Sequence, residues 1–241
     1  MRMTKFAVST MAALALAGWS ASAADTASIS GKVSFEGTPP KAKKINVDAD
    51  PKCAEAHADS PLMTEEVVVN PNGTLKNVFI YVKSGLEGKT YEPPKTPVVI
   101  DQAGCHYVPH VFGMMAKQPL EIINSDDTLH NIHAMPGPSA GNKEFNVGEP
   151  NKGMKVTRTF AHPEVMVHFK CDVHPWMSAY VGVLDNPFYS TTGDDGTFSI
   201  KNLPAGEYVI EAWHEKYGTQ TQKVKVGEGE AKTVDFTFKG E

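Results

Sequence analysis

The chain has 241 residues, of which 41% are hydrophobic and 21% are charged, and its formal net charge is −5. This modestly acidic balance, without a basic run, excludes the usual pattern of a nucleic-acid-binding protein. After the first residues, no segment approaches the roughly 20 apolar residues that a membrane-spanning helix needs, so we expect no membrane span.

The first 23 residues have the pattern of an export signal. Arg2 and Lys5 give a positive start, residues 6–18 are an apolar stretch, and residues 21–23 are small, as before a signal cleavage site. We therefore expect residues 1–23 to be a signal peptide that is removed, and the mature protein to be periplasmic or secreted.

Short strand signals dominate the rest of the chain, and no long amphipathic helix is indicated. Runs rich in Val, Ile, Phe, Tyr and Thr alternate with Gly, Pro, Asn and Asp. Strands are predicted at 28–35, 77–83, 97–101, 120–124, 156–160, 165–170, 179–184, 197–200, 208–213, 222–226 and 233–238. Many short strands at this spacing predict an all-β fold of the sandwich or barrel type.

Three cysteines in an exported chain leave one sulfur without a partner. Cys53 and Cys105 lie in polar, turn-rich sequence, and a disulfide between them is one of two open possibilities. The other is a second metal site formed with His106 and His110, although a bend with exposed histidines is the simpler interpretation. In either case Cys171 remains for a metal ion.

The strongest chemical signal is the run KCDVHPWM at residues 170–177. A copper electron-transfer site needs one thiolate and two imidazoles, with a weak thioether on its axis. Cys171, His174 and Met177 supply three of these donors on one short loop, and His130 is a candidate for the second imidazole.

Strand alternation supports a common location for the two sulfurs. Val165, Val167 and Phe169 share their parity with Cys171, and the apolar parity of a half-buried strand faces the core. Met177 has the parity of the apolar residues that follow it. We therefore expect both sulfur atoms to point inward at the same end of a sandwich.

Two stretches resemble the cupredoxins, and within them the amicyanin and plastocyanin group. They are PLEIINSDDTLHNIHAM, which ends at residue 135, and VHFKCDVHPWM, which ends at residue 177. The resemblance implies that residues 97–185 form a Greek-key cupredoxin-like copper domain. It also implies that His130, Cys171, His174 and Met177 hold one type-1 copper ion.

The same resemblance implies roles for neighbouring residues. Asn131 would tie the two ligand loops together, and Trp176 would be a hydrophobic lid or a docking residue. Cupredoxins move single electrons between redox proteins, so the implied partner is a redox protein, reached through an exposed imidazole edge of His174. His133 lies three residues after His130, and opposite strand parity would turn it away from the metal.

The flanking parts resemble a carboxypeptidase regulatory-like, or prealbumin-like, sandwich. GDDGTFSI at 193–200 and LPAGEY at 203–208 carry this resemblance, and ISGKVSFEGTPP at 29–40 looks like its first strand. Residues 186–241 would then form a smaller β domain, and residues 24–96 an N-terminal β segment that belongs to it or stands apart. Insertion of the copper domain and an arrangement in series both fit the sequence.

These patterns predict an electron carrier, with a copper storage or delivery protein as the alternative. Soft thiolate and thioether donors also hold Cu(I) without electron transfer. Copper oxidases and nitrite reductases add further copper sites with His-x-His pairs and a His-Cys-His run, which are absent from the sequence. We therefore do not expect an enzyme. An adhesion or assembly role for the regulatory-like part also stays open, as does the oligomeric state.

Overall fold

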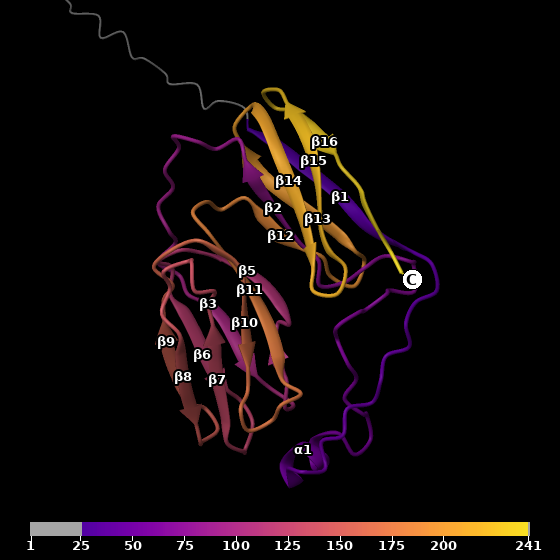
Figure 1. Cartoon of the computed structure of the whole chain (residues 1–241), viewed down its shortest axis with the longest axis vertical. Coiled ribbons are helices and arrows are strands. Elements are labelled where there is room, and N and C mark those ends of the chain that lie inside the picture. Colours follow the sequence, from indigo (N-terminus) through magenta and orange to yellow (C-terminus); the bar gives the residue numbers. More distant parts are fainter. Residues whose placement is uncertain (1–25, 241) are drawn as a thin grey trace, which may run out of the picture.

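Two β-sandwiches stacked end to end make up most of the molecule (Figure 1). The computed structural model describes residues 26–240, and the predicted signal peptide lies outside them. Within this range α1 (Pro51–Ala56) is the single helix, and no helix has the length and apolar character to cross a membrane. The predicted all-β fold is confirmed.

The upper sandwich in Figure 1, which we call the terminal sandwich, combines strands from both ends of the described chain. One sheet has the order β13-β1-β16, with β17 also paired to β1, and the other has the order β12-β2-β14-β15. Its strands are β1 (Ala27–Glu36), β2 (Phe79–Ser84), β12 (Tyr189–Thr191), β13 (Thr197–Leu203), β14 (Gly206–His214), β15 (Gly218–Val226), β16 (Ala231–Thr233) and β17 (Phe236–Lys239). Alternate side chains such as Ile29 and Val33 of β1 are fully buried in its core.

The lower sandwich, which we call the inserted sandwich, also has two sheets. Their orders are β5-β11-β10-β7-β8 and β4-β3-β6-β9. The strands are β3 (Val98–Gln102), β4 (Tyr107–Val108), β5 (Val111–Met115), β6 (Leu120–Asn124), β7 (His130–Met135), β8 (Phe145–Glu149), β9 (Lys155–Arg158), β10 (Glu164–Lys170) and β11 (Ser178–Leu184). Phe160 and Phe169 are buried in its core with rings 6.2 Å apart.

Strand pairing places the inserted sandwich between two parts of the terminal one. β1 pairs antiparallel with β13, where Ser30 lies opposite Ser199, and parallel with β17, where Val33 lies opposite Phe236. β2 lies between β12 and β14. The chain therefore begins the terminal sandwich with β1 and β2, builds β3 to β11, and returns to complete the first sandwich.

Two glycines allow the sandwiches to pack closely against each other. Gly113 of β5 and Gly182 of β11 lie side by side in the sheet. A Cβ on Gly182 would lie 2.4 Å from the Phe79 ring, and a Cβ on Gly113 would lie 2.4 Å from the Tyr189 ring. Only the absence of a side chain lets these two rings of the terminal sandwich reach the backbone of β5 and β11.

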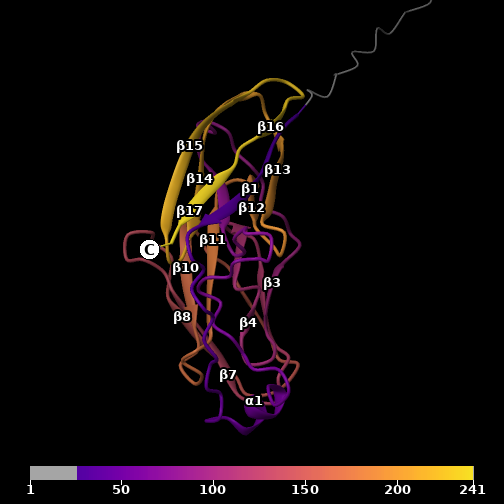
Figure 2. The same ribbon diagram turned by 90° about the vertical axis from the view of Figure 1, so that its right-hand side faces the viewer.

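A long connection between β1 and β2 runs to the far end of the inserted sandwich, where α1 lies (Figures 1 and 2). We call residues 43–64 of this connection the cap. Its base is closed by the pairing of Lys44 with Met63 and by a 2.9 Å hydrogen bond from the Ile45 N–H to the Leu62 carbonyl. Cys53 of α1 forms a disulfide with Cys105, which settles that pairing.

The strand before Cys171 departs from simple alternation. The register of β10 against β11 shifts between Glu164 and Val167, and Met166 has a positive φ of 65°. Val167 is buried, as predicted, but Val165 is 39% exposed, so its predicted place in the core is wrong. The irregularity at Met166 changes the phase of the strand, because one extra residue turns the preceding side chains to the other face.

Candidate metal centre

The four side chains predicted to bind metal are all buried at the capped end of the inserted sandwich. His130 is the first residue of β7, and Cys171 directly follows β10. His174 lies in the loop that leads to β11, and Met177 directly precedes that strand. Their exposed fractions are 0% for His130, 1% for Cys171, 2% for His174 and 1% for Met177.

Three of these residues bring potential ligand atoms together. Nδ1 of His130 lies 2.9 Å from Nδ1 of His174, and Sγ of Cys171 lies 3.9 Å from Nδ1 of His174. The three ligand atoms all lie within 4.8 Å of one another. Two donor atoms that each lie about 2.0–2.3 Å from the same metal ion are separated from each other by distances like those between these three atoms. A single metal ion therefore fits among them.

The loop between β10 and β11 is short and hydrogen-bonded to itself. The Cys171 N–H donates to the Met177 carbonyl over 3.3 Å, and the Met177 N–H donates to the His174 carbonyl over 2.9 Å. The His174 N–H donates to Sγ of Cys171 over 3.3 Å. These bonds place the thiol and the imidazole on the inner side of the loop, with the thioether buried at its end.

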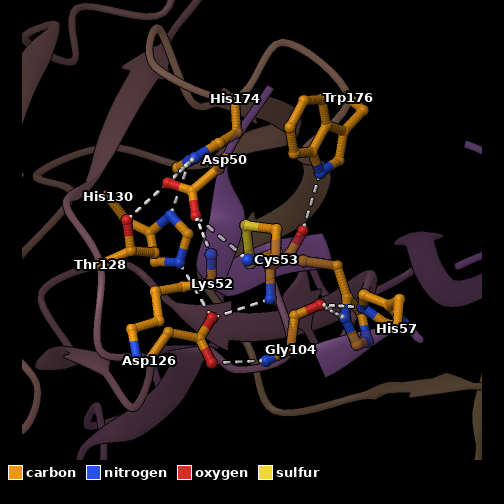
Figure 3. The surroundings of a disulfide bond; sticks show 12 residues. Asp50, Lys52, Cys53, His57, Gly104, Asp126, Thr128, His130, His174 and Trp176 are labelled. Carbon is orange, nitrogen blue, oxygen red and sulfur yellow. Dashed lines mark hydrogen bonds and ion pairs between the residues drawn. A yellow bond between two sulfur atoms is a disulfide. The ribbon is translucent and has the colours of Figure 1, made fainter. Parts of the chain in front are cut away.

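Two carboxylates hold the outer edges of the two imidazoles. Nε2 of His130 lies 2.9 Å from Oδ2 of Asp126, and Nε2 of His174 lies 3.2 Å from Oδ2 of Asp50 (Figure 3). A carboxylate accepts hydrogen bonds, so Nε2 of each ring carries the hydrogen. In a neutral imidazole Nδ1 is then a bare lone pair.

The facing Nδ1 atoms are the feature that calls for a cation. Two bare nitrogens 2.9 Å apart repel each other unless a proton or a metal ion shares their lone pairs. Because a thiol also faces this point, the donor set is two imidazole nitrogens and one sulfur. Such a set suits copper or zinc and not the oxygen-seeking magnesium or calcium.

The electrostatics of the two histidines differ. Burial opposes a charge on His130, but the Asp126 carboxylate and the nearby Cys171 sulfur raise its pKa to about 9. Burial lowers the pKa of His174, where Asp50 opposes the shift and the neighbouring His130 adds to it. The pair therefore accommodates one positive charge more readily than two, as expected for two rings that face one ion.

Hydrogen bonds lower the pKa of both the Cys171 thiol and the Asp50 carboxyl group. Burial alone would raise the pKa of the Cys171 thiol, but hydrogen bonds from His130 and from backbone N–H groups lower it. Burial alone would also raise the pKa of Asp50, but hydrogen bonds from Thr128, His174 and the first turn of α1 lower it to about 2. A thiolate between two oriented imidazoles is the ligand form that metals bind.

The cap covers the imidazole edge that was expected to be exposed. His174 is 2% exposed and its Nε2 faces Asp50 of the cap, so the expectation of an open edge is wrong. Trp176 also lies under the cap, with its ring 5.0 Å from that of His174 and its Nε1 donating to the Cys105 carbonyl over 3.0 Å. This position suits a lid over the site.

The ring nitrogens of the other histidine candidates face other partners. His133 is held by Asp172 at 3.0 Å and by Glu144 at 2.5 Å. His110 binds Glu215 at 2.7 Å. In the described part of the chain, neither His106 nor His110 belongs to a group of three potential metal ligands, so the alternative of a second metal site there receives no support.

Asp50 and Asp126 are the functional candidates that the sequence did not reveal. Asp126 lies four residues before His130, a spacing that could have been noticed in the turn before β7. Asp50 lies 124 residues from His174, and no local pattern connects the two. Only the disulfide-linked cap brings Asp50 to the site.

Comparisons with known proteins cover parts of the chain. Residues 175–239 match the family model of the carboxypeptidase regulatory-like domain. This match includes β12 to β17 of the terminal sandwich but also β11, which lies in a sheet of the inserted one. No curated protein matches the chain.

Several solved structures are weakly similar. A purple cupredoxin from Nitrosopumilus maritimus has 22% identity and a TM-score of 0.30, and the match covers 36% of this chain and 98% of that one. A Cu(I) form of an amicyanin mutant has 20% identity and a TM-score of 0.32, over 43% of this chain and 97% of that one. A copper-containing nitrite reductase from Thermus scotoductus has 21% identity and a TM-score of 0.34, over 42% of this chain but only 24% of that one. These values are too low to assign a function.

Proposed function

We propose that this chain is an exported copper protein that transfers single electrons, with one type-1 copper ion held by His130, Cys171, His174 and Met177. The observation that carries the proposal is the pair of Nδ1 atoms facing each other 2.9 Å apart beside the Cys171 sulfur. Two imidazoles, a thiolate and a nearby thioether are the ligand types of blue-copper sites.

Copper in such a site would supply a one-electron couple between Cu(I) and Cu(II). The chain's own residues would keep the donor atoms in place during the change of charge. Asp126 and Asp50 hold the imidazoles from outside, and Oδ1 of Asn131 lies 3.2 Å from Sγ of Cys171. Outer partners of this kind fix ligand orientation and tune the metal.

The enclosure of the site favours electron transfer over copper delivery. A delivery protein must let an acceptor reach the ligands, whereas His174 and Cys171 are each at most 2% exposed. An electron needs no open path for an ion. Electron transfer needs a single copper ion and no bound substrate, so we propose an electron carrier and not an enzyme.

The disulfide supports a location outside the cytoplasm. Cys53 and Cys105 are bonded, and such bonds persist in oxidising compartments such as the periplasm. The predicted signal at residues 1–23 agrees with this location. We therefore propose a periplasmic or secreted protein whose partner is another redox protein.

The test is a visible spectrum of the copper-loaded mature protein. We expect an intense sulfur-to-copper charge-transfer band that disappears in Cys171→Ser. His133→Ala is the matched control, because this histidine lies near the site but faces Asp172 and Glu144. The charge-transfer band should persist in this variant. Copper loading without the band would contradict the proposal, and a band without reversible one-electron voltammetry would favour storage.

A further inference from the structure

The cap covers the metal end of the inserted sandwich without belonging to either sandwich. Its buried apolar side chains are few: Val47, Cys53 and Leu62 pack with Cys105, and Trp176 of the ligand loop lies against them. The His57 ring adds a 2.7 Å contact from Nε2 to the Gly104 carbonyl. The cap is therefore held in place by specific contacts with the loops around the site.

Asp50 is the cap residue that reaches a predicted ligand, and its two oxygens have separate tasks. Oδ1 accepts from the N–H groups of Lys52 at 2.8 Å and Cys53 at 3.1 Å, which caps the start of α1. Oδ2 accepts from the Thr128 hydroxyl at 2.7 Å and faces Nε2 of His174 at 3.2 Å. Serine or asparagine would cap the helix equally well, so capping alone does not require the carboxylate.

The disulfide connects this contact to the corresponding one on the other histidine. The Cys53 N–H binds Asp50, and the Cys105 N–H binds Asp126 at 2.7 Å. Figure 3 shows both carboxylates beside the disulfide, each between a half-cystine backbone and one imidazole. The two groups that orient the predicted histidine ligands are thus carried by segments that are covalently joined.

We infer that Asp50 is a positioning residue for His174, presented by a disulfide-held cap that encloses the metal site. The inference rests on the proposed function and adds that control of one ligand comes from a segment outside the inserted sandwich. By accepting from Nε2, Asp50 keeps Nδ1 of His174 free for the metal. By covering the ring edge, the cap slows the escape of the ion.

The first test separates positioning from helix capping. Asp50→Ser keeps a good N-cap for α1 but removes the carboxylate from His174. Loss of such an outer partner weakens metal binding by about 10- to 100-fold, which we expect for Cu(I) measured against a competing chelator. Asp48→Asn is the matched control, because it removes one negative charge from an exposed position in the same cap. Its affinity should equal that of the wild type.

The second test needs no metal. In the metal-free wild type, ¹⁵N spectra should show His174 with its hydrogen on Nε2, and Asp50→Ser should shift it toward a mixture of tautomers. A third test uses the copper-loaded double variant Cys53→Ser and Cys105→Ser, in which Asp50 remains but the covalent link between the cap and Cys105 is absent. We expect this variant to lose copper to the chelator faster than the wild type does.

The outcomes distinguish this inference from the proposed function. A wild type that takes up no copper overturns both. A wild type that binds copper, together with an Asp50→Ser variant that matches Asp48→Asn in affinity and in the His174 tautomer, overturns the role of Asp50 alone. An unchanged rate of copper loss in the double cysteine variant overturns the enclosing role of the cap.

Discussion

Asn131 joins the two loops that carry the predicted ligands. Its Oδ1 accepts from the N–H groups of Asp172 at 2.8 Å and Val173 at 3.3 Å, and it lies 3.2 Å from the Cys171 sulfur. Its Nδ2 donates to Oδ1 of Asn146 at 2.7 Å. One amide oxygen next to His130 therefore organises the start of the loop that holds Cys171.

Replacing Asn131 with alanine should destabilise the metal-free protein. The variant leaves N–H groups of the ligand loop without their acceptor, and a buried unsatisfied group costs about 1–3 kcal/mol. Denaturant unfolding of Asn131→Ala should show a loss of this size. Asn146→Ala is the control. Asn146 is exposed and contacts Nδ2 of Asn131 and Oδ2 of Asp172, each at 2.7 Å, but it does not contact Oδ1 of Asn131, so its loss should stay within about 0.5 kcal/mol. Equal losses in the two variants would contradict the role of the oxygen.

His214 should make the protein sensitive to acid. Burial, with a smaller contribution from His110, lowers the pKa of His214 from 6.5 to about 4. Its Nδ1 accepts from the Lys216 N–H at 3.1 Å, so a proton there would break a native contact. Since the unfolded chain binds the proton more tightly, stability is complete above pH 6.5 and is lost as the pH falls toward 4.

The expected contribution of His214 between pH 7.5 and 4.5 is about 2–3 kcal/mol. His214→Gln cannot take up the proton, so its unfolding free energy should fall less over this interval than that of the wild type. His162→Gln, at an exposed histidine, should keep the wild-type pH dependence. Parallel pH profiles for the wild type and His214→Gln would refute the prediction.

The predictability of individual residues follows their separation along the chain. Cys171, His174 and Met177 stand on one loop, where spacing alone indicates a common site. Asp50 meets His174 only because the cap crosses the molecule, and a contact over 124 residues leaves no periodic or local pattern. The open edge expected for His174 was wrong for the same reason.

At the level of elements, strands with clear β-branched runs were predicted and those shaped by tertiary contacts were missed. The prediction for β6 at residues 120–124 matches the structure. β5 contains Gly113, which is tolerated because the Tyr189 ring packs on it, and β7 begins with the polar pair His130 and Asn131, which serve the site. Propensity cannot find strands whose residues are chosen for packing or chemistry.

Two valines of β10 test the irregularity at Met166. Val167 is fully buried and Val165 is 39% exposed, although strict alternation would bury both. Val167→Ala should cost about 2 kcal/mol, since it removes buried methyl groups and leaves a cavity. Val165→Ala should cost at most about 0.5 kcal/mol, the usual range for surface changes. Similar losses of unfolding free energy would mean that β10 keeps regular alternation.

For the whole molecule, the sequence indicated two kinds of β-structure but left their connection open. Insertion depends on β1 pairing with β13, β16 and β17, which lie near the other end of the chain. Such pairings depend on the sheet edges and apolar faces that the rest of the fold leaves uncovered. The local sequence patterns that predict short strands do not indicate these pairings. The same holds for the contact between the sandwiches, where Phe79 and Tyr189 lie on glycines of the inserted sheet.

The contact at Gly182 should couple the stability of the two sandwiches. Gly182→Ala would place a methyl group 2.4 Å from the Phe79 ring, and overpacking of this kind costs about 1–3 kcal/mol. Gly148→Ala in β8 is the matched control, because a Cβ there meets no atom within 4 Å, and it should be close to neutral. Phe79→Ala combined with Gly182→Ala should cost less than the sum of the two single changes, because the methyl group then enters the space left by the ring. Thermal and denaturant unfolding of the four variants measures this coupling, and strict additivity would show that the sandwiches do not meet through these residues.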